Sequence, residues 1–584
     1  MQIQSILNPK LLLLLAISSM LIFAKACSDD DPVSVSPAPE PDPEEEVTLV
    51  DVLADDEQYS TLVSLVPDDI LDVLATEELT VFAPTNAAFE AIPSDVLEGL
   101  SAEEVETILL YHVLQGTTLS GDIPEQLDAE SLLGELLLLQ GSNGVTINGS
   151  SQVVEADLTA DNGVVHAIDE VLLPSDIRKA LGTPNIVDTA EEAGDFETLL
   201  GALESTGLKT TVQFLEPYTV FAPTDDAFAA LPEGTLESLS AEQLTEILTY
   251  HVLGAEVFAG DLAPEQSPET LSGESIFVAA ENGSVTINGN SNVVQADVEA
   301  ENGVIHAVDA VLLPDAFGTV VDNAIKRFDF NTLVDAVVDA GLAEALQEEG
   351  PFTVFAPTDE AFANLPDGLL ASLSEEDLQE ILLYHVINAD IKSGDLEAEQ
   401  APEALSGEAL YVTANEGVTV NGSSSVVEAD VDAANGTIHA IDEVLLPNRF
   451  QNIVEIAQKN FELTTLVDLV IDADLAETLA GDGPFTLFAP INSAFDDISD
   501  ALEGLSIEEV ADILTYHVVS DLITSGDIPA GTTDVPTVNG EEITVVNEDG
   551  AVTVDGASVI TVDLEGTNGV IHLVDAVLLP SDFQ

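Results

Sequence analysis

Apolar residues recur along the chain in four similar blocks that alternate helical and strand-like spacing. In the first block, Ser101 and Glu104 match a capping box at the start of a helix. Val105, Ile108 and Leu109 follow at positions i, i+3 and i+4, which predicts a helix with one buried face. Equivalent caps begin at Ser240, Ser374 and Ser506.

Strand-like segments lie on both sides of this helix in every block. The earlier one is β-branched and aromatic and ends in proline, as at residues 80–84, which predicts a strand that proline stops. Asn-Gly or Asp-Gly pairs between later β-rich segments predict tight hairpins. These pairs begin at Asn148, Asn288, Asn421 and Asp555. Each block closes on Asn-Gly-x-x-His and Val-Leu-Leu-Pro, which predicts a buried strand ending at Pro174, Pro314, Pro447 or Pro580.

All eight histidines fall into two alternating sets with regular spacing. The two members within a block are 54 or 55 residues apart, and corresponding members of successive blocks are 132–140 apart. One set follows a tyrosine at the end of the capped helix: Tyr111-His112, Tyr250-His251, Tyr384-His385 and Tyr516-His517. The other follows Asn-Gly: His166, His306, His439 and His572. This periodicity indicates four copies of one domain of roughly 130 residues.

The repeats predict four domains, at residues 47–174, 184–314, 317–447 and 451–580. Few residues separate one copy from the next, so we expect an elongated, fairly stiff rod.

The start of the chain predicts export. Residues 11–24 form an apolar run of 14, too short to span a bilayer but typical of a signal peptide, so residues 1–26 should be removed. The only cysteine, Cys27, would then be N-terminal and cannot form an intramolecular disulfide. It resembles the lipidated cysteine of bacterial lipoproteins, and the acidic residues after it resemble a Bacteroidetes surface-export signal. A free thiol is the alternative.

Proline and acidic residues dominate residues 27–46, which we expect to form an extended stalk.

Charge narrows the range of partners. The chain has 110 Asp and Glu against 10 Lys and Arg, a formal net charge of −100. Nucleic acid and anionic lipid surfaces require clustered basic residues, so we exclude nucleic acid and expect membrane contact only through an N-terminal lipid. Cations, basic proteins and neutral glycans remain. The acidity is equally compatible with salt adaptation and with plain solubility.

Two sequence blocks, each present four times with the Tyr-His pair between them, resemble those of the fasciclin domain. They are Thr-Val-Phe-Ala-Pro-Thr-Asn/Asp-x-Ala-Phe and Asn-Gly-x-x-His-x-x-Asp-x-Val-Leu-Leu-Pro, and they cover about residues 47–580. The last repeat departs at Ile491 and Leu573, and its helix cap would shift to Asn492. The resemblance implies an α+β domain, a β-sandwich or wedge flanked by helices, and an extracellular adhesion function.

The resemblance also implicates the Tyr-His region in integrin binding by animal members. We carry this over as candidate adhesion residues at the four Tyr-His pairs, although integrins themselves do not transfer to a bacterial lipoprotein.

A structural role for the histidines is the competing interpretation. His112 falls on the apolar helix face and His166 inside a strand, where core histidines hydrogen-bond to backbone. We predict that role for His166, His306, His439 and His572. A metal site or acid–base pair formed by His112, His166 and Asp169 is a weaker alternative. We expect no catalytic residue, metal or cofactor, because no phosphate-binding loop or nucleophile elbow is present.

Repetition favours a multivalent array on the cell surface that binds an extracellular protein or glycan weakly per domain and tightly by avidity. The alternative is a passive spacer, or an acidic surface that gathers Ca²⁺ diffusely.

Overall fold

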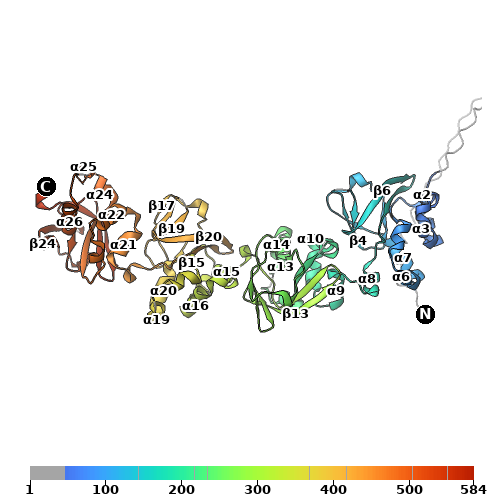
Figure 1. Ribbon diagram of the computed structural model, residues 1–584, viewed down its shortest axis with the longest axis horizontal. Coiled ribbons are helices and arrows are strands. Elements are labelled where there is room, and N and C mark those ends of the chain that lie inside the picture. The colour runs from blue at the N-terminus through green and yellow to red at the C-terminus, as the bar shows by residue number, and fades with distance from the viewer. Residues whose placement is uncertain are drawn as a thin grey trace, which may run out of the picture.

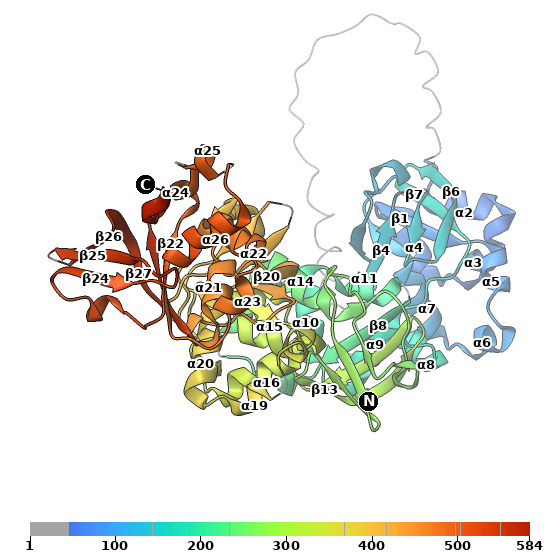
Figure 2. The same cartoon turned by 60° about the vertical axis from the view of Figure 1, so that its left-hand side comes forward.

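The computed structural model describes residues 46–583, except for residues 143, 216, 233, 367, 416, 497, 503 and 549. The predicted signal peptide, Cys27 and nearly all of the predicted stalk lie outside the described residues. Within them, the chain forms four α+β domains that follow one another in an elongated row (Figures 1 and 2). The predicted fold class is therefore confirmed.

Each domain is built on one seven-stranded sheet, which in domain 1 has the order β2-β1-β7-β6-β5-β4-β3. The pair β1 and β7 is parallel, and all other neighbours in this sheet are antiparallel. The strands are β1 (Leu79–Pro84), β2 (Val113–Gln115), β3 (Leu127–Glu130), β4 (Leu136–Gln140), β5 (Thr146–Ile147), β6 (Ser151–Ala160) and β7 (Gly163–Ile168).

Two hydrophobic cores form because alternate residues of a strand point to opposite faces. Phe82 of β1 packs with Leu137 and Leu139 of β4, so the two ends of the sheet close on each other as a wedge. Val81 and Ala83 face the opposite way, toward the helices. The same double core recurs in the other three domains.

Helices cover the second face. Each domain begins with a leading helix, and its first backbone amide donates to the asparagine of the Asn-Gly-x-x-His motif, as Leu49 does to Asn162 at 2.9 Å. The leading helices are α2 (Leu49–Asp55), α9 (Ile186–Ala193), α15 (Val320–Lys326) and α21 (Ile453–Lys459). The Ser-capped helices occur as predicted, each with a complete capping box: α7 (Ala102–Tyr111), α14 (Ala241–Tyr250), α20 (Glu375–Tyr384) and α26 (Ile507–Tyr516).

Strands that end in proline are confirmed in all four domains: β1, β8 (Tyr218–Pro223), β15 (Phe352–Pro357) and β22 (Phe485–Pro490). The closing strands are shorter than predicted. They are β7, β14 (Gly303–Val308), β21 (Gly436–Ile441) and β28 (Gly569–Val574), and they stop before the Val-Leu-Leu-Pro segment. The prediction that they run to proline is wrong because the Leu172 amide of this segment donates to the His112 ring instead of to a strand.

Two further details differ from expectation. Asn492 does not become a helix cap: it is the first residue of α24 (Asn492–Asp496), and its side-chain oxygen accepts from the Thr465 amide. The joint after domain 1 contains a helix of its own, α8 (Ser175–Leu181), whereas the next two joints contain only single 3-10 turns, η4 (Asp315–Phe317) and η7 (Asn448–Phe450).

Candidate functional site

The tyrosines of the Tyr-His pairs lie in the wedge core. Tyr111 has no exposed surface; its hydroxyl donates to the Leu136 carbonyl and accepts from the Asn148 side chain, both at 3.1 Å. Burial raises the pKa of Tyr111 above its ordinary value. Tyr250 and Tyr384 have the same pair of partners. None of these three side chains has surface exposed to solvent in the row of four domains.

The first histidine set is equally enclosed, and both ring nitrogens are engaged. His112 is 3% exposed; its Nδ1 lies 2.7 Å from the Ile108 carbonyl oxygen, and its Nε2 accepts from the Leu172 amide at 2.9 Å. The ring is therefore neutral, with the proton on Nδ1. Burial lowers its pKa to about 4, against the smaller effect of the Ile108 carbonyl. The same contacts recur at His251, His385 and His517.

The second histidine set holds a bulge in the longest strand. The Nε2 of His166 donates to the Thr118 carbonyl at 2.9 Å, and its Nδ1 accepts the amide of Asp157 at 3.2 Å. The ring also stacks on Phe82, with centroids 5.6 Å apart. The other three histidines of this set accept the equivalent aspartate amide in the same way. Burial lowers the pKa of His439 below its ordinary value.

The bulge pushes a short segment of strand outward. Between Val153 and Leu158 the register with β7 shifts twice, so β6 contains extra residues there. Asp157 adopts a left-handed φ of 59°, and its carboxylate accepts from the Ser120 amide at 2.8 Å. Asp297, Asp430 and Asp563 repeat this conformation and this type of contact.

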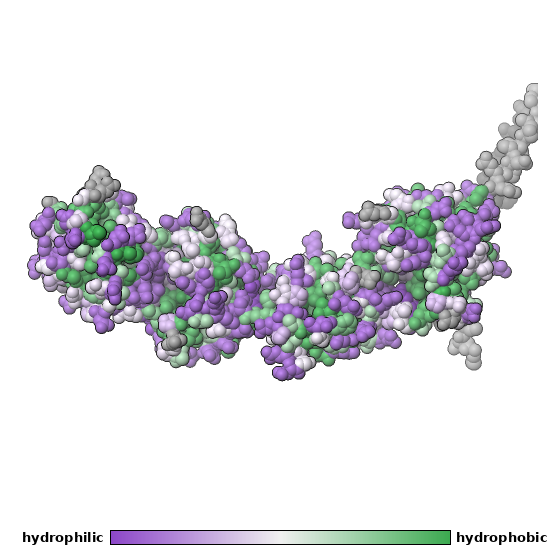
Figure 3. Space-filling view, in the orientation of Figure 1, coloured by the Kyte–Doolittle hydropathy of each residue, from purple (hydrophilic) through white to green (hydrophobic). Residues whose placement is uncertain are grey.

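An exposed branched residue stands just before each bulge. Val154, Val294, Val427 and Ile560 are 57%, 58%, 59% and 50% exposed. We call these four segments the bulge strips: residues 154–157, 294–297, 427–430 and 560–563, in β6, β13 (Ser291–Ala300), β20 (Ser424–Ala433) and β27 (Ala557–Gly566). Otherwise hydrophilic side chains are spread widely over the face shown in Figure 3, with apolar patches between them. The strips therefore present a branched apolar side chain at the same place in every domain, and the fourth strip adds Val562, which is 44% exposed.

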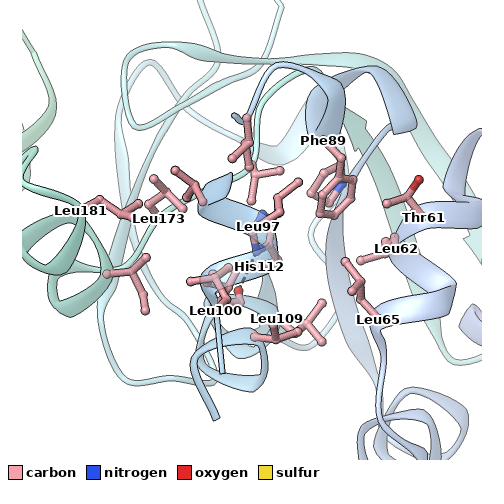
Figure 4. A pocket seen from close by; sticks show the side chains of 17 residues that line it. Thr61, Leu62, Leu65, Phe89, Leu97, Leu100, Leu109, His112, Leu173 and Leu181 are labelled. Atoms are coloured by element: carbon pink, nitrogen blue, oxygen red, sulfur yellow. Dashed lines mark hydrogen bonds between the residues drawn. The ribbon is translucent and has the colours of Figure 1, made fainter. Parts of the chain in front are cut away.

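A pocket of about 160 Å³ lies among the helices of domain 1 (Figure 4). Leu62, Phe89, Leu97 and Leu181 contribute to its apolar wall, and His112 and Thr61 are the polar residues of its lining. Because both nitrogens of His112 are already bonded, the pocket offers little to orient a ligand.

The proposed alternative of a metal site finds no geometric support. The side chains of His112 and His166 bond to separate backbone groups, and Asp169 accepts the Gln152 amide. In the part of the chain that the structure describes, no group of three His, Cys, Asp or Glu side chains could hold a metal ion. Among those same residues, no helix is long and apolar enough to cross a membrane.

A family model of the fasciclin domain matches residues 57–174, 194–314, 328–447 and 461–580. The chain belongs to the fasciclin domain family. Among its relatives, pig transforming growth factor-beta-induced protein ig-h3 is 30% identical over 512 residues, covering 86% of this chain and 73% of that protein. Human periostin is 29% identical over 514 residues, covering 86% of this chain and 60% of periostin.

A solved structure of a FAS1 domain pair from the insect cell adhesion molecule fasciclin I is also similar to this fasciclin array. It has a TM-score of 0.34 and 21% identity, covering 43% of this chain and 97% of that chain.

Sequence reasoning missed two sets of residues in these fasciclin domains. The bulge aspartates had a signal, since each stands nine residues before a second-set histidine. The other set is the basic residues of the joints, Arg178, Lys326 and Lys459, which contact the preceding domain. Their scarcity in so acidic a chain could have revealed them.

Proposed function

We propose that this protein is a multivalent adhesion or matrix-binding array whose four bulge strips contact an extracellular protein or glycan. The observation that carries the proposal is the exposed branched residue before the bulge, present in all four domains. A single Val side chain supplies little binding free energy. Four copies on one chain raise the overall affinity through effective concentration.

The histidines of the second set are the positioning residues of this proposed surface. His166 accepts the Asp157 amide of the bulge and donates to the Thr118 carbonyl in the loop that follows β2. These two bonds fix the direction in which Val154 and Glu155 point. The Tyr-His pairs remain candidate adhesion residues only through the core that they hold in place, because their side chains are buried.

We also propose that the array is displayed at the cell surface by a lipid on Cys27. Support comes from the apolar run and the acidic segment that flank this cysteine. The intact mass of the mature N-terminus tests it: an unmodified thiol at Cys27 would leave a secreted protein.

Adhesion can be measured as the attachment of beads coated with the full chain to matrix from the producing cells, under flow. Val154→Ser, Val294→Ser, Val427→Ser and Ile560→Ser are introduced one after another. We expect a stepwise loss that exceeds about 100-fold for all four, because avidity is lost with each contact. Control substitutions are Val338→Ser in α16 (Asn331–Asp339) and Ile471→Ser in α22 (Thr464–Asp472), which are 61% and 52% exposed.

Equal attachment of the wild type and the fourfold variant would refute the strips as adhesive contacts and favour a passive spacer. Attachment that persists in the variant but disappears when Ca²⁺ is chelated would instead favour the acidic, cation-gathering alternative.

A further inference from the structure

Each of the three joints places a cation against the tyrosine of the preceding domain. Lys459 Nζ lies 5.1 Å from the ring centroid of Tyr384 and 3.3 Å from its hydroxyl. Lys326 Nζ lies 6.0 Å from the ring centroid of Tyr250. Arg178, from α8, also interacts electrostatically with Tyr111, although its guanidinium lies over the ring of Phe214, 5.6 Å from the centroid. The tyrosines that looked like adhesion residues in the sequence therefore belong to the contact between domains.

A glutamate and an asparagine complete each of these contacts. The Glu135 carboxylate accepts the Ser175 amide at 3.0 Å and interacts electrostatically with Arg178. The same glutamate position faces Lys326 and Lys459 in the next two joints. We call each Tyr, Glu and Asn set a joint socket: Tyr111, Glu135 and Asn148; Tyr250, Glu274 and Asn288; Tyr384, Glu408 and Asn421.

Domain 4 has the same socket with one charge added. Glu541 accepts the Ser581 amide at 3.0 Å, as its counterparts do. Asp555 replaces the asparagine, and the Tyr516 hydroxyl donates to its carboxylate at 2.7 Å. Lys459, in the leading helix of domain 4, is engaged at the third socket, and residues 460–583 include no Lys or Arg.

The surface around the fourth socket is also more open. A Cβ at Gly149, Gly289 or Gly422 would lie 2.5, 2.7 or 3.0 Å from a carbonyl oxygen of the following domain. At the equivalent Gly556, no described atom outside its chain neighbours lies within 4 Å. In domains 2 and 3, the aromatic residues Phe277 and Tyr411 contact Phe328 and Phe461 of the next domain. The equivalent residue of domain 4 is Thr544, which has no aromatic ring. A partner at this socket would be held by charge more than by apolar packing.

In the described part of this chain, no lysine or arginine is free to occupy the fourth socket. Lys10 and Lys25 lie outside the described residues, and the other eight basic side chains are each bonded elsewhere. The leading helix of domain 1 is also unsuitable. We align the leading helices by their N-cap residues. At the position of Lys326 and Lys459, domain 1 has Asp55. At the position of Phe328 and Phe461, it has Glu57.

We propose that the fourth socket binds a lysine or arginine presented at the end of a helix, as the first three sockets do. Three cations in three equivalent sockets define the ligand, and the two carboxylates of Glu541 and Asp555 define the sign of the partner's charge. The inference is independent of the adhesion proposal, because one socket needs no array.

The test supplies the missing cation on the full chain itself. In the variant Asp55→Lys with Glu57→Gln, the leading helix of domain 1 carries a lysine where α15 and α21 carry theirs. The matched control is Asp55→Asn with Glu57→Gln, which differs only in the amine. Both side chains are exposed, so neither change disturbs the core. Sedimentation velocity over a concentration series, in about 50 mM salt to limit screening, measures head-to-tail association.

We expect the lysine variant to associate at least about tenfold more tightly than the control. Adding Glu541→Gln and Asp555→Asn should abolish that gain, because these changes remove both charges while Asp555→Asn restores the side chain found in the other sockets. Adding Asp482→Asn, an exposed acid before β22, should leave it intact. A lysine variant that sediments like the control, or association that survives loss of both carboxylates, would overturn the proposal.

Discussion

The ring of His112 keeps its place only while it is neutral, because Nδ1 must donate to Ile108 and Nε2 must accept from Leu172. Protonation would turn Nε2 into a donor facing another donor. The same conflict would arise in each domain, since all four rings of this set have equivalent contacts.

We therefore predict acid sensitivity from this residue. An unfolded histidine has a pKa near 6.5, whereas burial holds that of folded His112 at about 4. Between these values the unfolded chain binds a proton that the folded chain does not, so the free energy of unfolding falls as pH drops from about 6.5 toward 4. The loss should be on the order of 3 kcal/mol per domain. NMR titration of the ring signals and urea unfolding measure it.

Unfolding should be followed in about 1 M salt, which screens the repulsion among the many carboxylates. Glu135 acts in the opposite sense, because burial raises its pKa. Ring signals that titrate near pH 6.5 would contradict the tautomer derived from the structure.

At the scale of elements, the parallel pair of strands is possible only because the closing strand starts with glycine. Gly303 has a φ of +144°, and a Cβ there would lie 2.0 Å from the carbonyl oxygen of Tyr218 in β8. Both the backbone conformation and the approach of β8 exclude a side chain.

We expect Gly303→Ala to destabilise domain 2 by at least about 3 kcal/mol, through strain and separation of β8 from β14. Gly201→Ala is the control in the same domain: it lies in α10 (Glu197–Thr206), and its Cβ would meet nothing within 4 Å. It should stabilise the domain by up to about 1 kcal/mol. Hydrogen exchange of the β8 and β14 amides distinguishes the two. Equal protection in both variants would refute the role of Gly303.

Local signals were predictable from sequence and distant contacts were not. The capping box at Ser101 involves residues three apart, so its helix was predicted with the correct cap. The end of β7 was missed because a histidine 60 residues earlier takes the Leu172 amide. The exposed strips were missed because a bulge depends on the neighbouring strand, and the Tyr-His pairs drew attention by their regular spacing.

At the scale of the whole molecule, most of the few cations lie between domains rather than on their faces. Arg178 is the most firmly held: its guanidinium bonds to Asp188 at 2.8 and 3.2 Å, and the Asp188 side chain is 1% exposed. Such a pair is costly to break on one side, because the remaining charge stays buried.

Arg178→Met should therefore open the joint between domains 1 and 2, with a loss of about 3–5 kcal/mol in the stability of that contact. Distances between fluorophores on these two domains should broaden, whereas those between domains 3 and 4 should not. Arg449→Met is the control. It removes an ion pair with Asp377 in which the arginine side chain is 43% exposed, so both distance distributions should stay narrow. An unchanged distribution for Arg178→Met would show that the joint is held by other contacts, such as Gln126 to Thr211.

The socket recurs at every joint, so shortening the chain would not remove it. A protease cut between domains 2 and 3 would part Lys326 from Tyr250, and domain 2 would then present its own socket at the new end. Because Asn288 stands there in place of an aspartate, this end would carry one negative charge fewer and hold a basic partner less firmly. Removal of domain 4 would therefore lower the protein's affinity for such partners once, and further shortening would not lower it again, because the sockets of domains 1 to 3 all contain an asparagine.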